Sequence, residues 1–360
     1  MRKAGNRAVR LTGLVALMVL LINVMVLPGR AQVQTGLEGK RLSVLGDSIS
    51  TFAGVSNAVS YNSTLAQNAV YYTQGTMGIS REDTWWQQTC DLLGMELLVN
   101  NSWSGSCMYM TGAGTKGAFH NRCVQLHNQK NVQPDIIAIF LGTNDQDYFP
   151  DTLGTVAEID FDNLIVPKGK GFTYAQPTTT MEAYAIALHK ISQRYPQAEV
   201  YCMNLLYREG YTPETVTLFN IELAKLTKHF GVHLVDLTRC GVTTATASWY
   251  MGDWLHPASA GMDAITGALI SEILRSSRYV SEELTTEHVS YNLNKALILQ
   301  GNAHTVVSGS PFRADVVTTT GDPADVRVLM GEEDITETCY TDGVISIEAV
   351  TGSVYIRVNG

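Results

Sequence analysis

The stretch Arg41–Ser50, RLSVLGDSIS, decides the class of fold. Within it, Leu42–Leu45 is a short and mostly apolar run, typical of a strand that is covered on both faces. Gly46-Asp47-Ser48 follows directly, and glycine permits the tight turn that such a strand needs at its end. The stretch therefore predicts a buried parallel strand with a serine presented at its carboxyl end.

The same arrangement recurs along the chain. Apolar runs predict further strands at Glu96–Val99, Ile136–Leu141, Glu199–Met203 and His233–Val235. Amphipathic stretches predict helices from Thr84 to Leu93, from Thr180 to Tyr195, after Pro213 to Phe230, and after Pro257 to about Leu274. Strands that alternate with such helices indicate crossover connections, so we expect an α/β fold with one parallel sheet. Residues 146–176 follow neither period and are expected to form a long surface loop near the site.

The pattern changes after about Val280. The remaining chain is rich in turns and predicts strands at His304–Val307, Val316–Thr318, Val326–Met330, Val344–Ala349 and Ser353–Val358. No long amphipathic helix intervenes. We therefore divide the chain into residues 1–31, an α/β domain at 32–280, and a small β-sandwich-like domain at 281–360.

Residues 1–31 have the layout of a secretory signal peptide. The basic stretch MRKAGNRAVR precedes an apolar run from Leu11 to Leu27, and small residues with a turn lead to Ala31. Cleavage after Ala31 would release an exported protein, periplasmic or secreted. The alternative is an uncleaved anchor helix, because the run is just long enough to span a bilayer, although Asn23 interrupts it.

Composition excludes several classes of protein. The chain is 45% hydrophobic and 16% charged, as folded globular proteins are. Five of the 25 basic residues but none of the 34 acidic residues lie in residues 1–31, so the rest of the chain has a net charge of −14. A surface this acidic is a poor partner for nucleic acid or for anionic lipid headgroups.

The cysteines and histidines form no recognisable metal or redox motif. None of the six cysteines lies in a Cys-x-x-Cys, and no His, Asp and Glu cluster has ligand spacing. We therefore expect neither a metal nor another cofactor. Pairing of Cys107 with Cys123 is possible in an exported protein, and the sequence leaves it open.

The segment Asp253–Pro257 carries a candidate base for Ser48. A serine hydroxyl needs a neighbouring base to become nucleophilic, and that base needs a third group to orient it. Asp253 stands three residues before His256, and this spacing can let the carboxylate hold Nδ1 while Nε2 faces the serine. Of the eight histidines, His256 alone has an aspartate at this spacing inside a strand-to-helix connection. The alternative is that Asp253 merely caps the following helix.

Two further loops contain candidate donors to an oxyanion. Leu141–Asp145 follows the most apolar predicted strand, and the side-chain amide of Asn144 is a suitable donor. Gly105 lies in the loop after the second strand, where glycine lets a backbone N–H approach a substrate oxygen. Each loop could be an ordinary turn. Chance turns, however, are not expected to place all these groups at one sheet edge.

These blocks, in this order, resemble the SGNH/GDSL hydrolase family. The matching residues are Gly46-Asp47-Ser48, Gly105, Gly142-Thr143-Asn144-Asp145 and Asp253-x-x-His256-Pro257, within about residues 41–276. The resemblance implies a flavodoxin-like three-layer α/β/α sandwich, with Ser48 as nucleophile and with Asp253 and His256 completing a triad. It also implies an oxyanion hole made by the backbone N–H groups of Ser48 and Gly105 and by the amide of Asn144. Ile49 is a conservative departure, because the family often has leucine there.

Another serine hydrolase fold fits the sequence less well. The α/β-hydrolases need a Gly-x-Ser-x-Gly elbow before a helix, and Gly105-Ser106-Cys107-Met108-Tyr109 lacks its last glycine.

The substrate is expected to be a small ester. No long apolar lid is visible, so the pattern favours an exported esterase that removes short acyl groups such as acetyl from carbohydrate. Trp85, Trp103 and Trp254 are candidate contacts for a sugar ring, with ordinary core packing as the alternative. Lysophospholipase or thioesterase activity is also compatible with the resemblance. A non-catalytic protein that contacts a glycan or a surface partner through residues 281–360 is the alternative from another class.

Overall fold

The structure is a computed structural model that describes residues 35–55, 70–109, 117–206, 213–301, 303–320 and 324–360. The predicted signal peptide lies outside the described residues. Thr35–Gly360 form one compact unit. In the part of the chain that the structure describes, no helix combines the length and the apolar character needed to cross a bilayer.

A five-stranded parallel sheet forms the centre of the first part of this unit. Its strands are β1 Arg41–Gly46, β2 Glu96–Ser102, β3 Ile136–Phe140, β6 Glu199–Met203 and β7 His233–Val235. They lie in the order β2-β1-β3-β6-β7, which is the order of flavodoxin-like doubly wound sheets. The predicted fold class is therefore confirmed, and all five predicted strands are present. β2 runs on to Ser102, beyond its predicted end at Val99.

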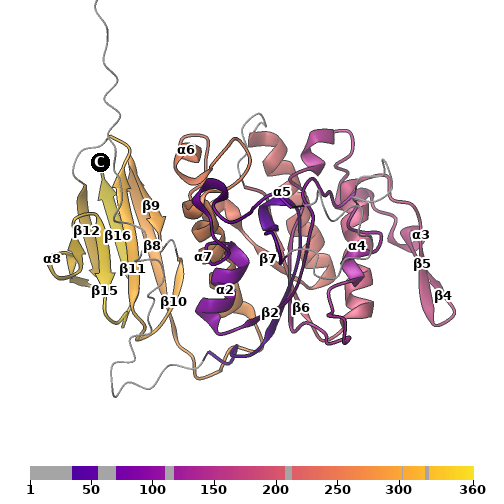
Figure 1. Ribbon diagram of the computed structural model, residues 1–360, viewed down its shortest axis with the longest axis horizontal. Coiled ribbons are helices and arrows are strands. Elements are labelled where there is room, and N and C mark those ends of the chain that lie inside the picture. Colours follow the sequence, from indigo (N-terminus) through magenta and orange to yellow (C-terminus); the bar gives the residue numbers. More distant parts are fainter. Residues whose placement is uncertain (1–34, 56–69, 110–116, 207–212, 302, 321–323) are drawn as a thin grey trace, which may run out of the picture. The chain divides into compact units, whose positions relative to one another are not determined.

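Four helices cover the two faces of this sheet (Figure 1). They are α2 Trp85–Leu93, α4 Thr180–Arg194, α5 Pro213–Phe230 and α7 Ser259–Ser276, each within two residues of its prediction. Side chains of α2 and α7 pack on one face, and those of α4 and α5 pack on the other. A capping box between Thr179 and Glu182 starts α4, and Gly94 with φ of 67° ends α2.

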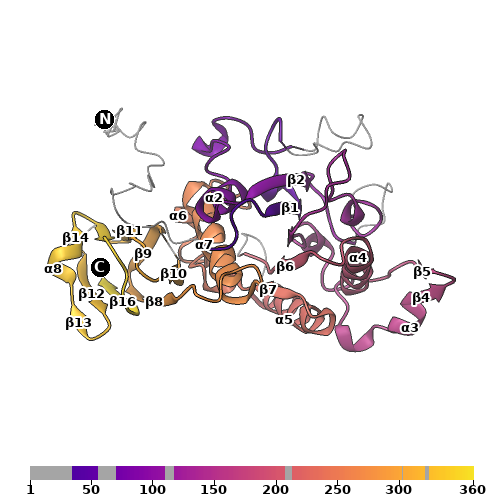
Figure 2. The ribbon, with the colours of Figure 1, turned by 90° about the horizontal axis from the view of Figure 1, so that it is seen from below.

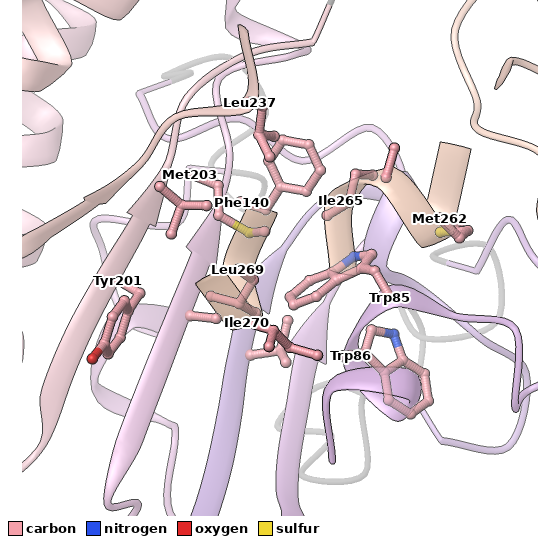
Figure 3. Packing of buried hydrophobic residues seen from close by; sticks show 14 of the residues in the cluster. Trp85, Trp86, Phe140, Tyr201, Met203, Leu237, Met262, Ile265, Leu269 and Ile270 are labelled. Carbon is pink, nitrogen blue, oxygen red and sulfur yellow. The ribbon is translucent and has the colours of Figure 1, made fainter. Parts of the chain in front are cut away.

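Alternate residues of each strand fill two separate cores. Ile136, Ala138 and Phe140 of β3 belong to the core beneath α2 and α7, whereas Ile137 and Ile139 belong to the core beneath α4 and α5. Figure 3 shows the first of these cores, in which the indole of Trp85 lies among Phe140 and side chains of α7. Covering on both faces explains why the strands read as continuous apolar runs.

Residues 146–176 differ from the expected long loop. A short helix, α3 Phe161–Leu164, leads into β4 Ile165–Lys168, which pairs with β5 Gly171–Tyr174 as an antiparallel hairpin. The hairpin projects away from the central sheet in both views (Figures 1 and 2). The expectation of a structureless loop is wrong, because four-residue strands, one of them containing Pro167, are too short to show a reliable alternation.

The last part of the chain is a β-sandwich. One sheet has the order β10-β8-β16-β12-β13 and the other β14-β15-β11-β9, and their inner faces share one apolar core. The elements are β8 Thr286–Asn294, β9 Ala296–Gln300, β10 Thr305–Val307, β11 Phe312–Thr318, β12 Asp325–Met330, β13 Glu333–Asp334, α8 Thr336–Cys339, β14 Tyr340–Thr341, β15 Val344–Ile347 and β16 Val354–Asn359. The predicted strands are present, whereas β8, β9 and the two-residue strands β13 and β14 were not predicted. The domain boundary at residue 280 stays a prediction.

Residues of strand β9 and the glycine that follows it contact the α/β part. Leu297 belongs to the same apolar core as α2 and α7. The hydroxyl of Tyr250, at the end of α6 Ala247–Tyr250, donates a 2.7 Å hydrogen bond to the carbonyl of Ile298. The backbone N–H of Gly301 donates to the carboxylate of Asp263 on α7. The two parts therefore share a packed interface as well as a chain connection.

The cysteine pairing that the sequence left open is not formed. Cys107 and Cys123 stand as separate buried thiols. Burial raises the pKa of Cys123 to about 11, which is the behaviour of a packed, unreactive thiol.

Candidate active site

The loops that follow β1, β2 and β3 meet at one edge of the sheet. Gly46, at the end of β1, is in register with Ser102 of β2 and with Phe140 of β3. Ser48, Gly105 and Asn144 therefore follow strand ends that lie at the same level. In doubly wound sheets, ligands bind outside the carboxyl ends of strands where the order of strands reverses, and here that is between β1 and β3.

Ser48 is held in a short 3-10 turn that begins directly after β1. Asp47 caps this turn, because its carboxylate accepts a 3.0 Å hydrogen bond from the backbone N–H of Ile49. A Cβ atom at Gly46 would meet the hydroxyl oxygen of Ser50 at 2.5 Å. The turn is therefore compatible only with glycine before Asp47, which gives the Gly-Asp-Ser block a steric reason.

The hydroxyl, imidazole and carboxylate predicted to act together lie within hydrogen-bonding distance. Ser48 Oγ is 2.9 Å from His256 Nε2, and His256 Nδ1 is 3.0 Å from Asp253 Oδ2. Ser48 is 3% exposed and His256 is 7% exposed. The fold thus brings together two residues that lie 208 positions apart in the sequence.

Asp253 is a well-satisfied carboxylate. Its Oδ1 accepts hydrogen bonds from the backbone N–H groups of Leu255 at 2.7 Å and His256 at 2.6 Å. Partial burial opposes ionisation, but the hydrogen bonds from His256, Tyr71 and Leu255 outweigh it and lower the pKa of Asp253 to about 2. The carboxylate is therefore charged at neutral pH and favours the imidazole tautomer that has its proton on Nδ1.

The loop after β3 supports the loop after β2. The side-chain amide of Asn144 donates a 2.8 Å hydrogen bond to the carbonyl of Ser106, and an amide has a second N–H to offer. The carboxylate of Asp145 accepts hydrogen bonds from the backbone N–H groups of Met108 and Tyr109, at 2.8 and 2.9 Å. Gly105 has φ of 69°, a left-handed conformation that favours glycine.

Arg122 lies beneath this edge and was not found from the sequence. It is 3% exposed, and its guanidinium donates to the carbonyls of Gly46 and Asn101, at 3.3 and 2.9 Å, and to the hydroxyl of Ser106. Its planar group also lies 4.9 Å from the ring centroid of Trp103. One cation thus ties together the ends of β1 and β2. A single arginine in a short turn carries no periodicity, so nothing in the sequence singles it out.

Two buried acids accompany Arg122. Burial raises the pKa of Asp47 to about 7, and burial raises the pKa of Asp145 to about 6. Burial lowers the pKa of Arg122 to about 10, which still leaves it protonated at neutral pH. The edge of the sheet therefore keeps several ionisable groups away from water.

Tyr71 is a second residue that the sequence did not reveal. Its ring stacks on the imidazole of His256, with 3.4 Å between ring centroids and 10° between planes. Its hydroxyl donates a 2.7 Å hydrogen bond to Asp253 Oδ2. Tyr71 lies in no regular helix or strand, so no pattern pointed to it.

The three candidate tryptophans have different positions. Trp85 is fully buried against Phe140, with ring centroids 6.3 Å apart, so its prediction as a substrate contact is wrong. The large apolar area of its indole is used in the core instead. Trp103 is half-buried beside Arg122, and Trp254 is 51% exposed. Their roles stay predictions.

The arrangement has no feature of a metal centre. Within the residues that the structure describes, no group of three or more His, Cys, Asp and Glu side chains is placed to hold a metal ion.

A hydroxyl, an imidazole and a carboxylate at the switch point of a flavodoxin-like sheet define the class of serine hydrolases with this fold. The chain belongs to the GDSL-like lipase/acylhydrolase family, whose family model matches residues 40–273, and it is a serine ester hydrolase. No curated protein matches the sequence.

Several solved structures are similar to this chain. A protein described as a GDSL-like lipase from Bacteroides ovatus is 25% identical, with 66% of this chain and 100% of that chain covered and a TM-score of 0.47. One described in the same way from Bacteroides uniformis is 25% identical, with coverages of 64% and 93% and a TM-score of 0.45. A carbohydrate esterase family 3 protein from Talaromyces cellulolyticus is 15% identical, with coverages of 67% and 100% and a TM-score of 0.42.

Proposed function

We propose that this chain is an exported esterase that removes short acyl groups, such as acetyl, from carbohydrate through an acyl-enzyme on Ser48. The observation that carries the catalytic part of the proposal is the hydrogen-bonded series from Ser48 Oγ to His256 to Asp253.

The first half of the reaction is acylation. His256 Nε2 takes the proton of Ser48 as Oγ attacks the ester carbonyl, and the carbonyl oxygen becomes an oxyanion. The backbone N–H groups of Ser48 and Gly105 and the amide of Asn144 stabilise that oxyanion. The protonated His256 then gives its proton to the leaving alcohol. The acyl group remains on Ser48, and Asp253 stabilises the imidazolium during this step.

The second half is deacylation. A water molecule loses a proton to His256 and attacks the acyl carbon, and the same donors stabilise the second oxyanion. The bond to Ser48 Oγ breaks, and the proton returns from His256 to that oxygen. The products are a carboxylic acid and the free enzyme.

The low exposure of the nucleophile supports a short acyl group. Ser48 and His256 are 3% and 7% exposed, so little open surface surrounds the reacting atoms. A net charge of −9 for the whole chain also disfavours binding to anionic lipid surfaces. Both observations argue for a small, soluble ester.

Exposed aromatic rings support a carbohydrate alcohol. Trp254 stands between the two proposed triad members Asp253 and His256 and is 51% exposed, and Trp249, five residues earlier in the chain, is 40% exposed. A half-exposed indole presents an apolar face, and that face can stack on the apolar face of a sugar ring.

Covalent labelling tests the catalytic part of the proposal. A fluorophosphonate probe should attach to Ser48, as located by mass spectrometry, and Ser48→Ala should abolish labelling. The same substitution should lower turnover of 4-nitrophenyl acetate by about 10⁴-fold or more. Normal turnover by Ser48→Ala would contradict the assignment.

A substrate series tests the specificity. Among 4-nitrophenyl esters, kcat/KM should be highest for acetate and fall with chain length, and acetylated oligosaccharides should be better substrates than simple acetates. Trp254→Ala should raise KM for the oligosaccharide about 3- to 10-fold, the loss of one aromatic contact, and should leave 4-nitrophenyl acetate unaffected. Leu218→Ala, at an equally exposed apolar residue on α5, is the matched control. Preference for octanoate or for a lysophospholipid would contradict the proposal.

Export rests on residues 1–31 and is tested separately. Expression of the full chain with its N-terminal segment should yield an exported protein whose first residue is Gln32. A protein that keeps Met1 and stays with the membrane fraction would favour the anchor helix instead.

A further inference from the structure

Tyr71 touches both groups that would activate Ser48. Its ring covers one face of the His256 imidazole, with centroids 3.4 Å apart, and its hydroxyl reaches Asp253 Oδ2 at 2.7 Å. Asp253 Oδ2 is also the oxygen nearest to His256 Nδ1, at 3.0 Å. One side chain therefore contacts the base and the acid at the same time.

Tyr71 is itself fixed to the turn that carries the nucleophile. Its backbone N–H donates a 2.8 Å hydrogen bond to the hydroxyl of Thr51, and that hydroxyl donates a 2.8 Å hydrogen bond to the carbonyl of Ser48. Thr51 is fully buried. A shift of Tyr71 would therefore disturb the turn at Ser48.

The neighbouring Tyr72 connects the same two segments, the turn at Ser48 and the segment that contains His256. Its carbonyl accepts a 2.9 Å hydrogen bond from the backbone N–H of Ala53, close to the Ser48 turn. Its hydroxyl donates a 2.7 Å hydrogen bond to the carbonyl of Pro257, the residue after His256. The pair Tyr71–Tyr72 thus joins the nucleophile's turn to the segment of the acid and base, although these segments lie about 200 residues apart in the chain.

We propose that Tyr71 is a positioning residue for the base, with its ring setting the plane of the His256 imidazole and its hydroxyl orienting the Asp253 carboxylate. This inference rests on the proposed roles of Ser48, His256 and Asp253. The ring holds Nε2 toward Ser48 Oγ and presents a π face to the imidazolium that forms when His256 takes the proton. The hydroxyl fixes the carboxylate in the plane that Nδ1 requires.

Two substitutions separate the ring from the hydroxyl. Tyr71→Phe keeps the stacked ring and removes the hydrogen bond to a charged acceptor, so kcat should fall about 3- to 10-fold. Tyr71→Leu removes both contributions, and kcat should fall about 30- to 100-fold. KM for 4-nitrophenyl acetate should change little in either variant, because Tyr71 acts on the base and not on the ester.

The rate of fluorophosphonate labelling isolates this effect. Labelling requires an activated Ser48 but no carbohydrate binding, so its second-order rate constant should fall in parallel with kcat in both variants. In an Asp253→Ala background, Tyr71→Phe should have no further effect, because the hydroxyl has lost its acceptor. If Tyr71 had only a structural role, Tyr71→Phe would lower the labelling rate constant by the same factor in the Asp253→Ala background as in the wild type.

A matched control comes from the sandwich. Tyr291→Phe also removes a tyrosine hydroxyl, one that donates to the carbonyl of Ala303 at 2.6 Å. Its labelling rate should equal that of the wild type. Thermal unfolding of every variant checks that loss of rate does not come from loss of the folded state.

The outcomes distinguish this inference from the proposed function. If the wild type is not labelled at Ser48, the proposed function fails and the inference fails with it. If the wild type is labelled and folded Tyr71→Leu is labelled equally fast, the inference is overturned and the proposed function stands. A rise in KM with unchanged kcat would also overturn it, because Tyr71 would then contact the substrate. If Tyr71→Leu does not fold, the Tyr71→Phe cycle with Asp253→Ala decides alone.

Discussion

The edge of the sheet that carries Ser48, which we call the proposed catalytic edge, and the core of the C-terminal sandwich bury different kinds of side chain. At the edge, Asp47, Asp145 and Arg122 are each almost completely buried. The sandwich core consists of apolar side chains, and an ion pair such as Arg327–Asp334 stays on its surface. Buried charge is costly, so it is retained where it positions reacting groups and avoided where only packing is needed.

This difference predicts opposite responses to substitution. Changes at the proposed catalytic edge should lower the reaction rate more than they lower the free energy of unfolding. Changes in the sandwich core should do the reverse. Four substitutions sharpen or break this comparison, and we take them in order of expected effect.

The largest effect is expected for Asp253→Asn. Asparagine can still accept the hydrogen bonds from Leu255 and His256, but its amide favours the wrong imidazole tautomer, so kcat should fall about 10⁴-fold. Steady-state kinetics with 4-nitrophenyl acetate measures the loss, and the free energy of unfolding should change little. A rate within tenfold of the wild type would mean that Asp253 does not orient His256.

Asn144→Ala should follow. Loss of one oxyanion donor costs about 10²- to 10³-fold in kcat, while KM should stay nearly constant because the interaction forms in the transition state. Asn144→Asp serves as the companion variant, since it keeps the size but puts a negative charge beside the oxyanion. An equal rise in KM with no loss of kcat would show a binding role instead.

Ile356→Ala tests the other region. Ile356 is fully buried in β16, so truncation should lower the free energy of unfolding by about 3 kcal/mol. Urea denaturation measures this loss, and the labelling rate of Ser48 at 25 °C should not change. A slower labelling rate in the folded variant would show that the sandwich supports the proposed catalytic edge, and the comparison would then break.

The smallest effect concerns pH. The pKa of Asp47 is about 7 in the folded chain because of burial and 3.8 when unfolded, so its contribution to stability is present below pH 3.8 and is lost as pH rises to 7. Asp47→Asn removes this contribution, so the free energy of unfolding of the variant should fall less steeply with pH over that range, by up to about 1.4 kcal/mol per pH unit. Urea denaturation at several pH values measures the two slopes. Equal slopes would mean that Asp47 ionises as freely as in the unfolded chain.

Much of the fold could be read from the sequence because the sheet is covered on both faces. Runs such as Ile136–Phe140 are apolar throughout, and the helices begin and end at recognisable signals such as Pro213 and Gly94. The strands of the hairpin at 165–174 were missed because they are short and exposed. β8 was missed because most of its side chains are polar.

The residues of the candidate site likewise fall into those that a local sequence pattern reveals and those that it does not. Ser48, Asn144 and His256 lie in short blocks whose spacing is visible in the sequence, and the structure brings them to one sheet edge. Arg122 and Tyr71 make contacts across the fold, with partners about 20 and 180 residues away in the chain. No local pattern encodes such contacts. Trp85 shows the opposite error, since a tryptophan near a motif need not face the substrate.

The separation of Ser48 and His256 by 208 residues in the chain has a consequence for when the site forms during folding. The serine is made early, on the first strand, but it meets its base only after the last strand of the sheet is in place. Partly folded molecules therefore carry an inert hydroxyl and cannot attack esters before folding is complete. During refolding, the recovery of fluorophosphonate labelling would therefore measure the fraction of fully folded molecules. It should lag behind the recovery of helical circular dichroism, because contacts between distant segments form slowly.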